Sequence, residues 1–508
     1  MLFNSYQFLI FFPIAVVGYY IIPEKYRNVW LLILSYYFYM CWNAIYAVLI
    51  FFSTFTTWVC ANVVSNKNKN PRYRKTALVI SILLNILILF FFKYYTMFAD
   101  MLVSVLGAIG IQVGFPELSL LLPVGISFYT FQALGYAIDV YRGTVEHEEN
   151  FLKYALFVSF FPQLVAGPIE RSSNLLPQFS RKHSLSFDNY AAGMRLMLIG
   201  FFKKVVIADN LSIAVERYYA NLEIWPGPLL LLGIFLFAIQ IYCDFSAYSD
   251  IARGAAKVLD FDLMKNFDHP YFSHSISEFW RRWHISLGSW FRDYMFYPIL
   301  RSKWCMQLTK KLKKSGHKKI AKVLPAMIAQ IIVWLSTGLW HGARITYVFW
   351  GGLHGFYQIV ENIWGVYFEK SDKVSLSDKY PKAYGAFQML RTFALVCVGY
   401  VFFRSENLHQ AWFIISRSVR GWGTILSPVS LFQAAVSMIG SNYSMLVCLV
   451  SVMILLVIEL IEIKNNSGFE QLVGKLSFGK QWAIYYGLML FIALYGAFGA
   501  SAFIYFQF

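Results

Sequence analysis

Residues 228–246 read PLLLLGIFLFAIQIYCDFS, and this run decides the class of fold. It carries no charged side chain before Asp244, and about 20 apolar residues are enough to cross the hydrocarbon core of a bilayer as a helix. The run ends in polar residues, with Asp244, Ser246, Tyr248 and Asp250 close together. Two interpretations stay open: the helix end reaches the membrane interface, or these side chains form a polar lining that holds neighbouring segments or contacts a ligand.

Similar apolar runs recur along the whole chain. Hydrophobic residues make up 58% of the 508 positions and charged residues only 14%, against about 25% charged in a soluble domain. The sequence therefore predicts an all-α polytopic membrane protein with roughly 11 to 14 transmembrane or re-entrant helices. The runs lie near residues 6–22, 28–43, 45–64, 76–95, 119–140, 152–168, 190–208, 228–246, 323–340, 345–365, 386–403, 444–463 and 482–506, with a further candidate at 98–114.

Some of these runs are interrupted by proline and glycine, as in Leu122-Pro123-Val124-Gly125. Broken helices are tolerated in a membrane only where protein or a water-filled cavity covers their free backbone groups. We therefore expect a sealed interior with non-helical stretches. The first run has no basic residue before it and no small-residue cleavage site after it, so we expect it to remain as a span.

The net charge of +17 is concentrated in two loops. Short basic loops between spans prefer the cytoplasm, which places both loops there and the N-terminus outside. Basic loops that flank spans need no nucleic acid, so membrane lipids are the predicted partners of this charge. The first loop holds Lys67, Lys69, Arg72, Arg74 and Lys75, and the second holds Arg301, Lys303, Lys310, Lys311, Lys313, Lys314, Lys318 and Lys319.

The cysteines predict neither a disulfide framework nor a metal site. They are scattered and include no CxxC pair, so we interpret them as small buried apolar residues. The six are Cys41, Cys60, Cys243, Cys305, Cys397 and Cys448.

Residues 277–294 read SEFWRRWHISLGSWFRDY and form an amphipathic pattern. At about 100° per residue, this segment separates into a charged arc and an opposite, aromatic arc. The charged arc includes Arg281, Arg282 and Ser286, and the aromatic arc includes Trp280, Trp283, His284 and Leu287. The segment is too charged to span, so we expect an interfacial helix beside the basic loop at 301–319. His284 is either a buried, hydrogen-bonded structural histidine or a site residue.

Two further histidines lie in or beside apolar runs. Residues 334–342 read WLSTGLWHG, which includes Trp340 and His341, and residues 350–355 read WGGLHG, which includes His354. A histidine in an apolar wall is often structural, but it can also act as a general base near neutral pH. The chain has no Gly-rich phosphate loop with its lysine, no HExxH and no GxSxG, which disfavours ATP hydrolysis, zinc proteolysis and an in-chain serine triad.

Taken in order, these motifs resemble the membrane-bound O-acyltransferase family, and within it the bacterial branch of alginate O-acetyltransferase-like proteins. The resemblance rests on YCDFSAYSD at 242–250, FWRRWHISL at 279–287 and WHG at 340–342, with PVGISFY at 123–129 and AGPI at 166–169 in support. One departure is that a tryptophan is expected about three residues after WHG, where this chain continues Ala343-Arg344-Ile345-Thr346.

The resemblance implies a multi-pass protein of the cell membrane whose helices surround a central tunnel. It implies that His341 is the active-site histidine and His284 the second functional position, with no bound cofactor and no metal. We expect one membrane domain over residues 1–508, with N-terminal helices over 1–118, a catalytic core over 119–365 and C-terminal helices over 366–508. The predicted substrate-binding or tunnel-lining residues are Asp244, Ser246, Tyr248, Asp250, Arg281, Arg282, Trp340 and His354.

The implied reaction is O-acetylation of an extracytoplasmic polysaccharide. An acyl thioester such as acetyl-coenzyme A would donate from the cytoplasmic side, and His341 would take the proton of the attacking hydroxyl. The family branch commonly passes the acyl group to an extracytoplasmic SGNH-hydrolase-like partner. Two alternatives remain: D-alanyl transfer to teichoic acid from a carrier protein, and non-enzymatic transport of a glycan or lipid.

Overall fold

The structure is a computed structural model that describes residues 1–116, 122–367, 380–499 and 503–504. The described residues are helical or irregular, apart from a single antiparallel bridge between Phe267 and Trp283. They form two compact units. The first consists of Met1–Asn210, Ile241–Lys265 and Val447–Phe508, and the second of Leu211–Gln240 and Asn266–Leu446.

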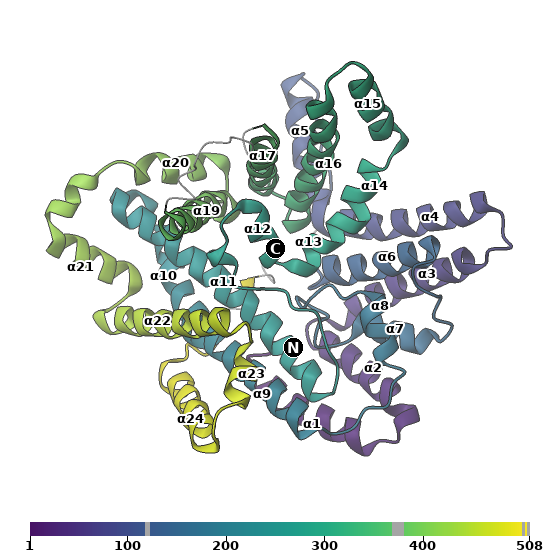
Figure 1. The fold of residues 1–508 in the computed structure, drawn as a ribbon, viewed down its shortest axis with the longest axis horizontal. Helices are drawn as coiled ribbons and strands as arrows, with labels where there is room; N and C mark the ends of the chain where they lie inside the picture. The colour runs from purple at the N-terminus through teal and green to yellow at the C-terminus, as the bar shows by residue number, and fades with distance from the viewer. Residues whose placement is uncertain (117–121, 368–379, 500–502, 505–508) are drawn as a thin grey trace. The chain divides into compact units, whose positions relative to one another are not determined.

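The first unit holds the N-terminal helices and the C-terminal ones (Figure 1). Its helices are α1 (Tyr6–Ile21), α2 (Glu24–Met40), η1 (Ala44–Tyr46), α3 (Ala47–Ser65), α4 (Pro71–Leu89), η2 (Phe90–Tyr94), α5 (Tyr95–Ala108), α6 (Ile126–Arg142), α7 (Phe151–Ser159), α8 (Ser172–Gln178), α9 (Phe187–Phe201), η3 (Phe202–Ala208), the second half of α11 (Gly227–Val258), most of α22 (Asn442–Asn465), α23 (Phe469–Gly474) and α24 (Phe478–Tyr495).

The second unit holds His284, His341 and His354 and the second basic loop, at 301–319. Its helices are most of α10 (Asp209–Ala220), η4 (Leu222–Ile224), the first half of α11, η5 (Pro270–Phe272), α12 (Ile276–Arg282), α13 (Ile285–Phe291), η6 (Arg292–Phe296), α14 (Tyr297–Leu300), α15 (Lys303–Lys314), α16 (Lys318–His341), α17 (Ile345–Tyr367), α19 (Pro381–Arg404), α20 (Leu408–Ser418), η7 (Trp422–Leu426) and α21 (Pro428–Ile439).

The structure confirms an all-α polytopic membrane protein. Six described helical segments are long and apolar enough to cross a membrane, and Tyr6–Ile21 and Pro428–Ile439 are shorter apolar helices. Other apolar runs predicted from the sequence fold as shorter or interrupted helices. The six are Ala44–Ser65, Pro71–Ala108, Gly227–Val258, Lys318–His341, Pro381–Arg404 and Asn442–Asn465.

The predicted span at 152–168 is one of these interrupted runs. Its helix, α7, ends at Ser159, and the chain then turns through residues 161–166 with Phe160 and Phe161 fully buried. The apolar character of this stretch comes from burial inside the protein. The expected break near Pro123 is confirmed at Gly125, which caps α6 at φ +75° and lies so close to the 164–165 backbone that a methyl group there would be 2.8 Å from Leu164 O. Residues 119–121 of the same predicted span lie outside the described residues.

The expectation of one continuous amphipathic helix over 277–294 is wrong. Helix α12 ends at Arg282, and α13 begins at Ile285. Between them His284 adopts φ +46°, a left-handed conformation that interrupts the helix. Ser286, expected on the charged arc, is fully buried. The side chains of Trp283, His284 and Leu287 are buried as expected.

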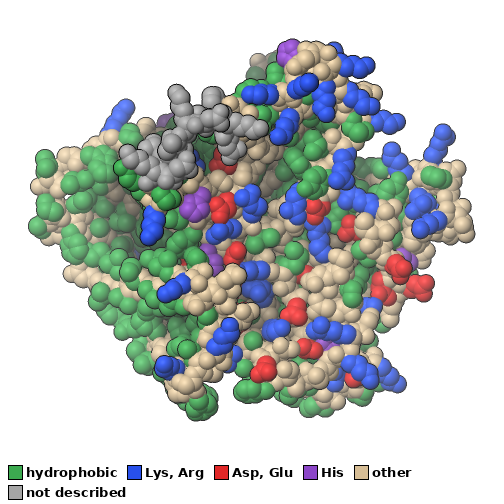
Figure 2. All heavy atoms as spheres, viewed as in Figure 1, with side chains coloured by type: hydrophobic (Ala, Val, Ile, Leu, Met, Phe, Trp, Pro, Cys, Tyr) green, Lys and Arg blue, Asp and Glu red, His purple; other side chains and the backbone are tan. Residues whose placement is uncertain are grey.

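The second basic loop forms a separate helix, α15, and the start of α16. Ser302 begins α15 by accepting a hydrogen bond from the backbone N–H of Cys305 at 3.3 Å. Figure 2 shows the Lys and Arg side chains that gather over α15 at the top of the view. The second basic loop is therefore an exposed feature of the second unit. The predicted domain, with its stretches 1–118, 119–365 and 366–508, stays a prediction.

Candidate active site

The second unit brings three histidines and the tryptophans between them into one buried cluster. From ring to ring, His284 lies 5.8 Å from Trp340, Trp340 lies 4.9 Å from His341, His341 lies 4.9 Å from Trp350, and Trp350 lies 5.2 Å from His354. The histidines are 1%, 3% and 0% exposed in chain order. We call these five residues the histidine–tryptophan cluster. It joins the predicted active-site histidine His341 to His284, Trp340 and His354.

A backbone-to-backbone contact between α16 and α17 places His341. A methyl group added at Gly338 would lie 2.3 Å from the carbonyl oxygen of Tyr347, and one added at Gly351 would lie 2.3 Å from that of Trp334. Only glycine permits so close an approach, as in other membrane helix pairs. His341 is the last residue of α16, and the short turn after it brings α17 back so that Trp350 meets the imidazole.

His354 is held by packing and by one hydrogen bond. Trp280 donates from Nε1 to His354 Nδ1 at 3.2 Å, and the Trp334 ring lies 5.7 Å away. Because an indole N–H can only donate, Nδ1 is an acceptor and the ring hydrogen is on Nε2. Helix α19 packs closely against the Nε2 side of this ring, since a methyl group at Gly399 would lie 2.7 Å from His354 Nε2.

His284 occupies the left-handed turn between α12 and α13. Helix α12 begins with a reciprocal cap, in which Ser275 Oγ accepts from Glu278 N at 3.0 Å and Glu278 Oε2 accepts from His274 N at 2.8 Å. The turn that ends this helix carries His284 into the interior. Burial lowers the pKa of His284 to about 3, so the ring is neutral at physiological pH.

A cavity of about 500 Å³ adjoins this cluster within the second unit. Its wall includes Trp280 and Trp334, which contact His354, and Thr337, which lies one turn before His341 on α16. Arg281 and Arg292 supply positive charge, and the volume is typical of a small-molecule site. Arg282, the other predicted arginine, pairs with Glu278 at 2.7 Å and does not line the cavity.

The polar end of α11 belongs to the first unit, and its contacts there are with that unit's own residues. Asp244 accepts from Lys204 Nζ and from the backbone N–H of Ile504, both at 2.6 Å, and Lys204 also pairs with Asp209 at 2.8 Å. Tyr248 packs between Phe3 and Phe503, with ring centroids 4.8 and 5.0 Å away. Asp244 and Tyr248 thus contact residues near the N-terminus (Phe3) and near the C-terminus (Phe503 and Ile504).

The other two predicted residues of this stretch also lie in the first unit. Asp250 accepts from Lys203 Nζ at 2.9 Å, and Ser246 is 1% exposed. A substrate-positioning role for Asp244, Ser246, Tyr248 and Asp250 stays a prediction.

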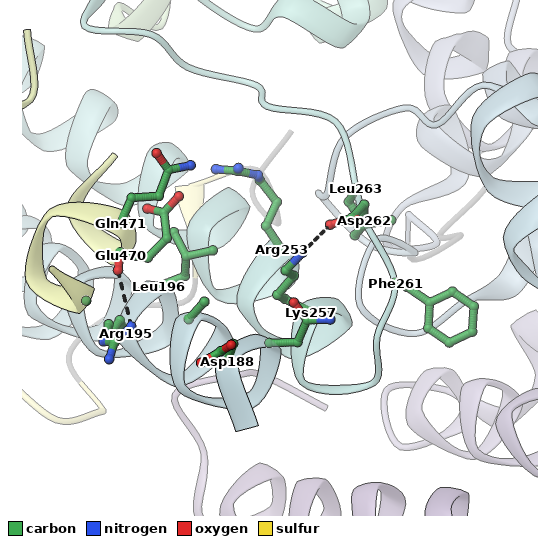
Figure 3. Close-up of a pocket in the computed structure, with 13 residues that line it drawn as sticks. Asp188, Arg195, Leu196, Arg253, Lys257, Phe261, Asp262, Leu263, Glu470 and Gln471 are labelled. Carbon is green, nitrogen blue, oxygen red and sulfur yellow. Dashed lines mark hydrogen bonds and ion pairs between the residues drawn. The ribbon is translucent and has the colours of Figure 1, made fainter. Parts of the chain in front are cut away.

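A second cavity, of about 470 Å³, lies in the first unit between α9, the end of α11 and α23 (Figure 3). Its lining carries equal numbers of acids and cations: Asp188, Asp262 and Glu470 against Arg195, Arg253 and Lys257. Lys257 pairs with Asp262 at 2.7 Å. The balance gives this cavity no preference for an anion.

In the part of the chain that the structure describes, no three His, Cys, Asp or Glu side chains lie close enough together to hold a metal ion. All six cysteines have free thiols. Cys60, Cys243, Cys305 and Cys448 are buried as predicted, but Cys397 is half-buried and Cys41 is exposed, so the prediction of a buried thiol is wrong for Cys41.

The structure adds residues that the sequence did not single out. Trp350 lies four residues before His354, and that helical spacing could have signalled a shared face. Trp280 was placed on the aromatic arc, but nothing in its pattern indicated a bond to His354. Asn266, which contacts His284, lies in an irregular segment and carries no sequence signal.

Comparisons with known proteins show the family of this chain. A family model described as MBOAT, the membrane-bound O-acyltransferase family, matches residues 145–402, which contain the whole histidine–tryptophan cluster. A probable alginate O-acetylase of Pseudomonas aeruginosa is 36% identical over 415 residues, covering 81% of this chain and 74% of the relative.

Two other relatives have different acceptors. A peptidoglycan O-acetyltransferase of Helicobacter pylori is 31% identical over 468 residues, covering 85% of this chain and 82% of the relative. A teichoic acid D-alanyltransferase of Bacillus subtilis is 26% identical over 303 residues, covering 58% of this chain and 72% of the relative.

Proposed function

The chain belongs to the membrane-bound O-acyltransferase family and is an O-acyltransferase. We propose that it moves an acetyl group from a cytoplasmic thioester donor across the membrane for O-acetylation of an extracytoplasmic polysaccharide. The observation that carries this proposal is the place of His341. Its imidazole is buried among Trp340, Trp350 and Phe403 at the end of α16, one turn after Thr337, which lines the cavity. A general base held in a water-poor site can act on a hydroxyl without competing hydrolysis.

In the proposed reaction, His341 takes the proton of the acceptor hydroxyl as its oxygen attacks the thioester carbonyl. The tetrahedral intermediate collapses by breaking the carbon–sulfur bond, and the proton passes from His341 to the leaving sulfur. The products are the acetyl ester and the free thiol. His284 has the role of orienting the donor or the tunnel wall, and His354 supports the cluster through packing.

The donor side of the proposal rests on charge. Arg281 and Arg292 line the cavity, and the basic residues of α15 lie in the same unit. Positive charge around an apolar cavity favours an acidic donor with an apolar thioester end, such as acetyl-coenzyme A. We further propose an extracytoplasmic SGNH-hydrolase-like partner that completes transfer to the polymer; polysaccharide acetylation by membranes lacking any such partner would contradict this part.

Transfer of radiolabelled acetyl from acetyl-coenzyme A tests the proposal, with purified wild type, His341→Ala and the matched control His409→Ala. His409 is an exposed histidine outside the cluster. We expect label to leave the donor with wild type and His409→Ala, and a fall of about 10²- to 10⁴-fold with His341→Ala at an unchanged thermal midpoint. Full transfer by a folded His341→Ala protein would overturn the base assignment.

D-alanyl transfer from a carrier protein is the second candidate, favoured by the likeness to the teichoic acid D-alanyltransferases and by the basic α15, which suits an acidic carrier. The identity to the O-acetylating relatives is higher and covers more of the chain, which favours acetyl. Offering acetyl-coenzyme A and an aminoacyl carrier in parallel separates the two donors.

A further inference from the structure

Asn266 is a fully buried residue that holds the turn carrying His284. The chain around Asn266 runs antiparallel to the end of α12. Asp268 N donates to Arg282 O at 2.9 Å, and Ile285 N donates to Asn266 O at 3.0 Å. These bonds flank His284 and retain its left-handed backbone, a conformation that is unfavourable for a non-glycine residue.

The side-chain amide of Asn266 has one orientation that fits its neighbours. The Oδ1 atom lies 3.1 Å from Ser286 N, 2.9 Å from Ser286 Oγ and 3.3 Å from His284 Nδ1. A backbone N–H can only donate, so the amide atom that faces it is the oxygen. The opposite orientation would set the amide NH₂ against that N–H. The Nδ2 atom is buried, with no hydrogen-bond partner among the described residues.

The amide orientation decides the tautomer of His284. An amide oxygen only accepts hydrogen bonds, so His284 Nδ1 must carry the ring hydrogen. A neutral imidazole has one N–H, which leaves Nε2 as an acceptor with a lone pair. Burial lowers the pKa of this ring to about 3, so the imidazole is neutral at physiological pH. His354 shows the reverse arrangement, with the hydrogen on Nε2.

We propose that Asn266 is a positioning residue, which fixes His284 as the Nδ1–H tautomer so that Nε2 accepts a hydrogen bond from an O–H or N–H of the bound substrates. The inference rests on the proposed function, in which His284 is the second functional residue. The ring of Trp340 lies against both His284 and His341, so the acceptor nitrogen belongs to the same cluster as the general base.

Nitrogen NMR of the full chain with ¹⁵N-labelled histidine rings tests the tautomer without relying on activity. The spectrum of His284→Gln identifies the signals of His284. We expect wild type to show the Nδ1–H form, Asn266→Ala to shift to the Nε2–H form or a mixture, and Ser286→Ala to keep the wild-type form. Ser286→Ala is the matched control because it removes a neighbour of the same oxygen and leaves the bond to His284. An Nε2–H form in wild type, or no change in Asn266→Ala, would overturn the proposal.

Asn266→Asp tests the role in transfer and keeps the shape of the side chain. A carboxylate still accepts from Ser286 N and His284 Nδ1, but its charge stabilises the imidazolium and raises the pKa of His284 by about 1 to 3 units. Below the raised pKa the ring is protonated and Nε2 loses its lone pair. We therefore expect the acid limb of the transfer rate to move to higher pH by about one unit or more, which is about a tenfold loss at the foot of the limb, with near wild-type transfer at high pH.

A purely structural role predicts a loss in Asn266→Asp that is the same at every pH, and that result would overturn the proposal. If wild type transfers no acetyl from acetyl-coenzyme A, the proposed donor fails, and the NMR result alone decides the assignment of Asn266.

Discussion

The indole of Trp350 meets the imidazole of His341 edge to face, with the ring centroids 4.9 Å apart and the ring planes at 87°. The same indole contacts His354 at 5.2 Å and Phe403 at 5.2 Å. Because His354 and Phe403 hold the Trp350 indole, the indole in turn limits the orientations of the His341 ring. The orientation of His341 therefore depends on a residue of the next helix, which is itself 2% exposed.

Replacing Trp350 should damage both stability and transfer. Trp350→Ala removes a buried indole and is expected to destabilise by about 3–5 kcal/mol. Trp350→Phe keeps most of the packing but lets His341 reorient, so we expect a fall in acetyl transfer of about 10- to 100-fold with a smaller change in thermal midpoint. Trp304→Phe, at a 56% exposed position on α15, is the matched control. Equal transfer by Trp350→Phe and Trp304→Phe would show that the edge-to-face contact does not orient His341.

The α16–α17 contact predicts opposite effects for two adjacent glycines. A methyl group at Gly351 would lie 2.3 Å from the Trp334 carbonyl oxygen, whereas one at Gly352 would lie 3.7 Å from its nearest neighbour, Leu335 Cδ2. Gly351→Ala should therefore push the helices apart, with a loss of about 1–3 kcal/mol and reduced transfer. Gly352→Ala should leave the thermal midpoint unchanged or raise it, because alanine favours helix. Thermal unfolding of both proteins checks this, and equal midpoints would contradict the contact.

The ion cluster of the first unit predicts a stability role for Asp244. Lys204 is fully buried between Asp209 and Asp244, so Asp244→Asn leaves part of its charge uncompensated. We expect a loss of about 3–5 kcal/mol, against about 0–1 kcal/mol for Asp262→Asn, whose pair with Lys257 is exposed. Should Asp244→Asn keep its thermal midpoint while the KM for donor or acceptor rises, the substrate-positioning role would be supported instead.

Glu170 predicts a pH-dependent stability. Burial raises its pKa to about 7, in spite of hydrogen bonds from Asn174 and from the backbone N–H of Met264. A carboxyl whose pKa is raised by folding stabilises the protein below its unfolded pKa, and this contribution is lost as the pH rises through about 7. The thermal midpoint of wild type should therefore fall between pH 5 and pH 8 by more than that of Glu170→Gln, which mimics the protonated form. Parallel pH profiles for the two proteins would contradict the assignment.

The sequence predicted the fold class, and four of the predicted site residues, His284, Trp340, His341 and His354, lie in one buried cluster, whereas their roles stay predictions. Long apolar runs and the scarcity of charge are direct consequences of the lipid solvent, so the all-α membrane fold was readable. His341, Trp340 and His354 share a cluster because their spacing places them at the facing surfaces of one helix pair. Which apolar runs would form one uninterrupted helix was not readable, since an apolar run buried in protein, such as 152–168, looks the same as one exposed to lipid.

Interruptions of helices, and contacts between residues distant in the sequence, were not readable from the sequence. The turn at His284 needs a positive φ, which a glycine would have signalled and a histidine does not. The turn is held by Asn266, which lies in the irregular segment before α12. The sequence required partners or water for the carboxylates of α11, but Lys204 could not be chosen as the partner of Asp244, because that pairing arises only when α11 packs beside η3.

The tautomer of His284 also bears on inhibitor design. A compound aimed at this imidazole meets the lone pair of Nε2, so it needs a hydrogen-bond donor, such as an amide N–H or a hydroxyl, at the contacting position. A carbonyl or carboxylate at that position would place one lone pair against another and lose affinity. Fragment screens against this enzyme should therefore be enriched in donor-tipped compounds, in contrast to screens against enzymes whose site histidine presents its N–H.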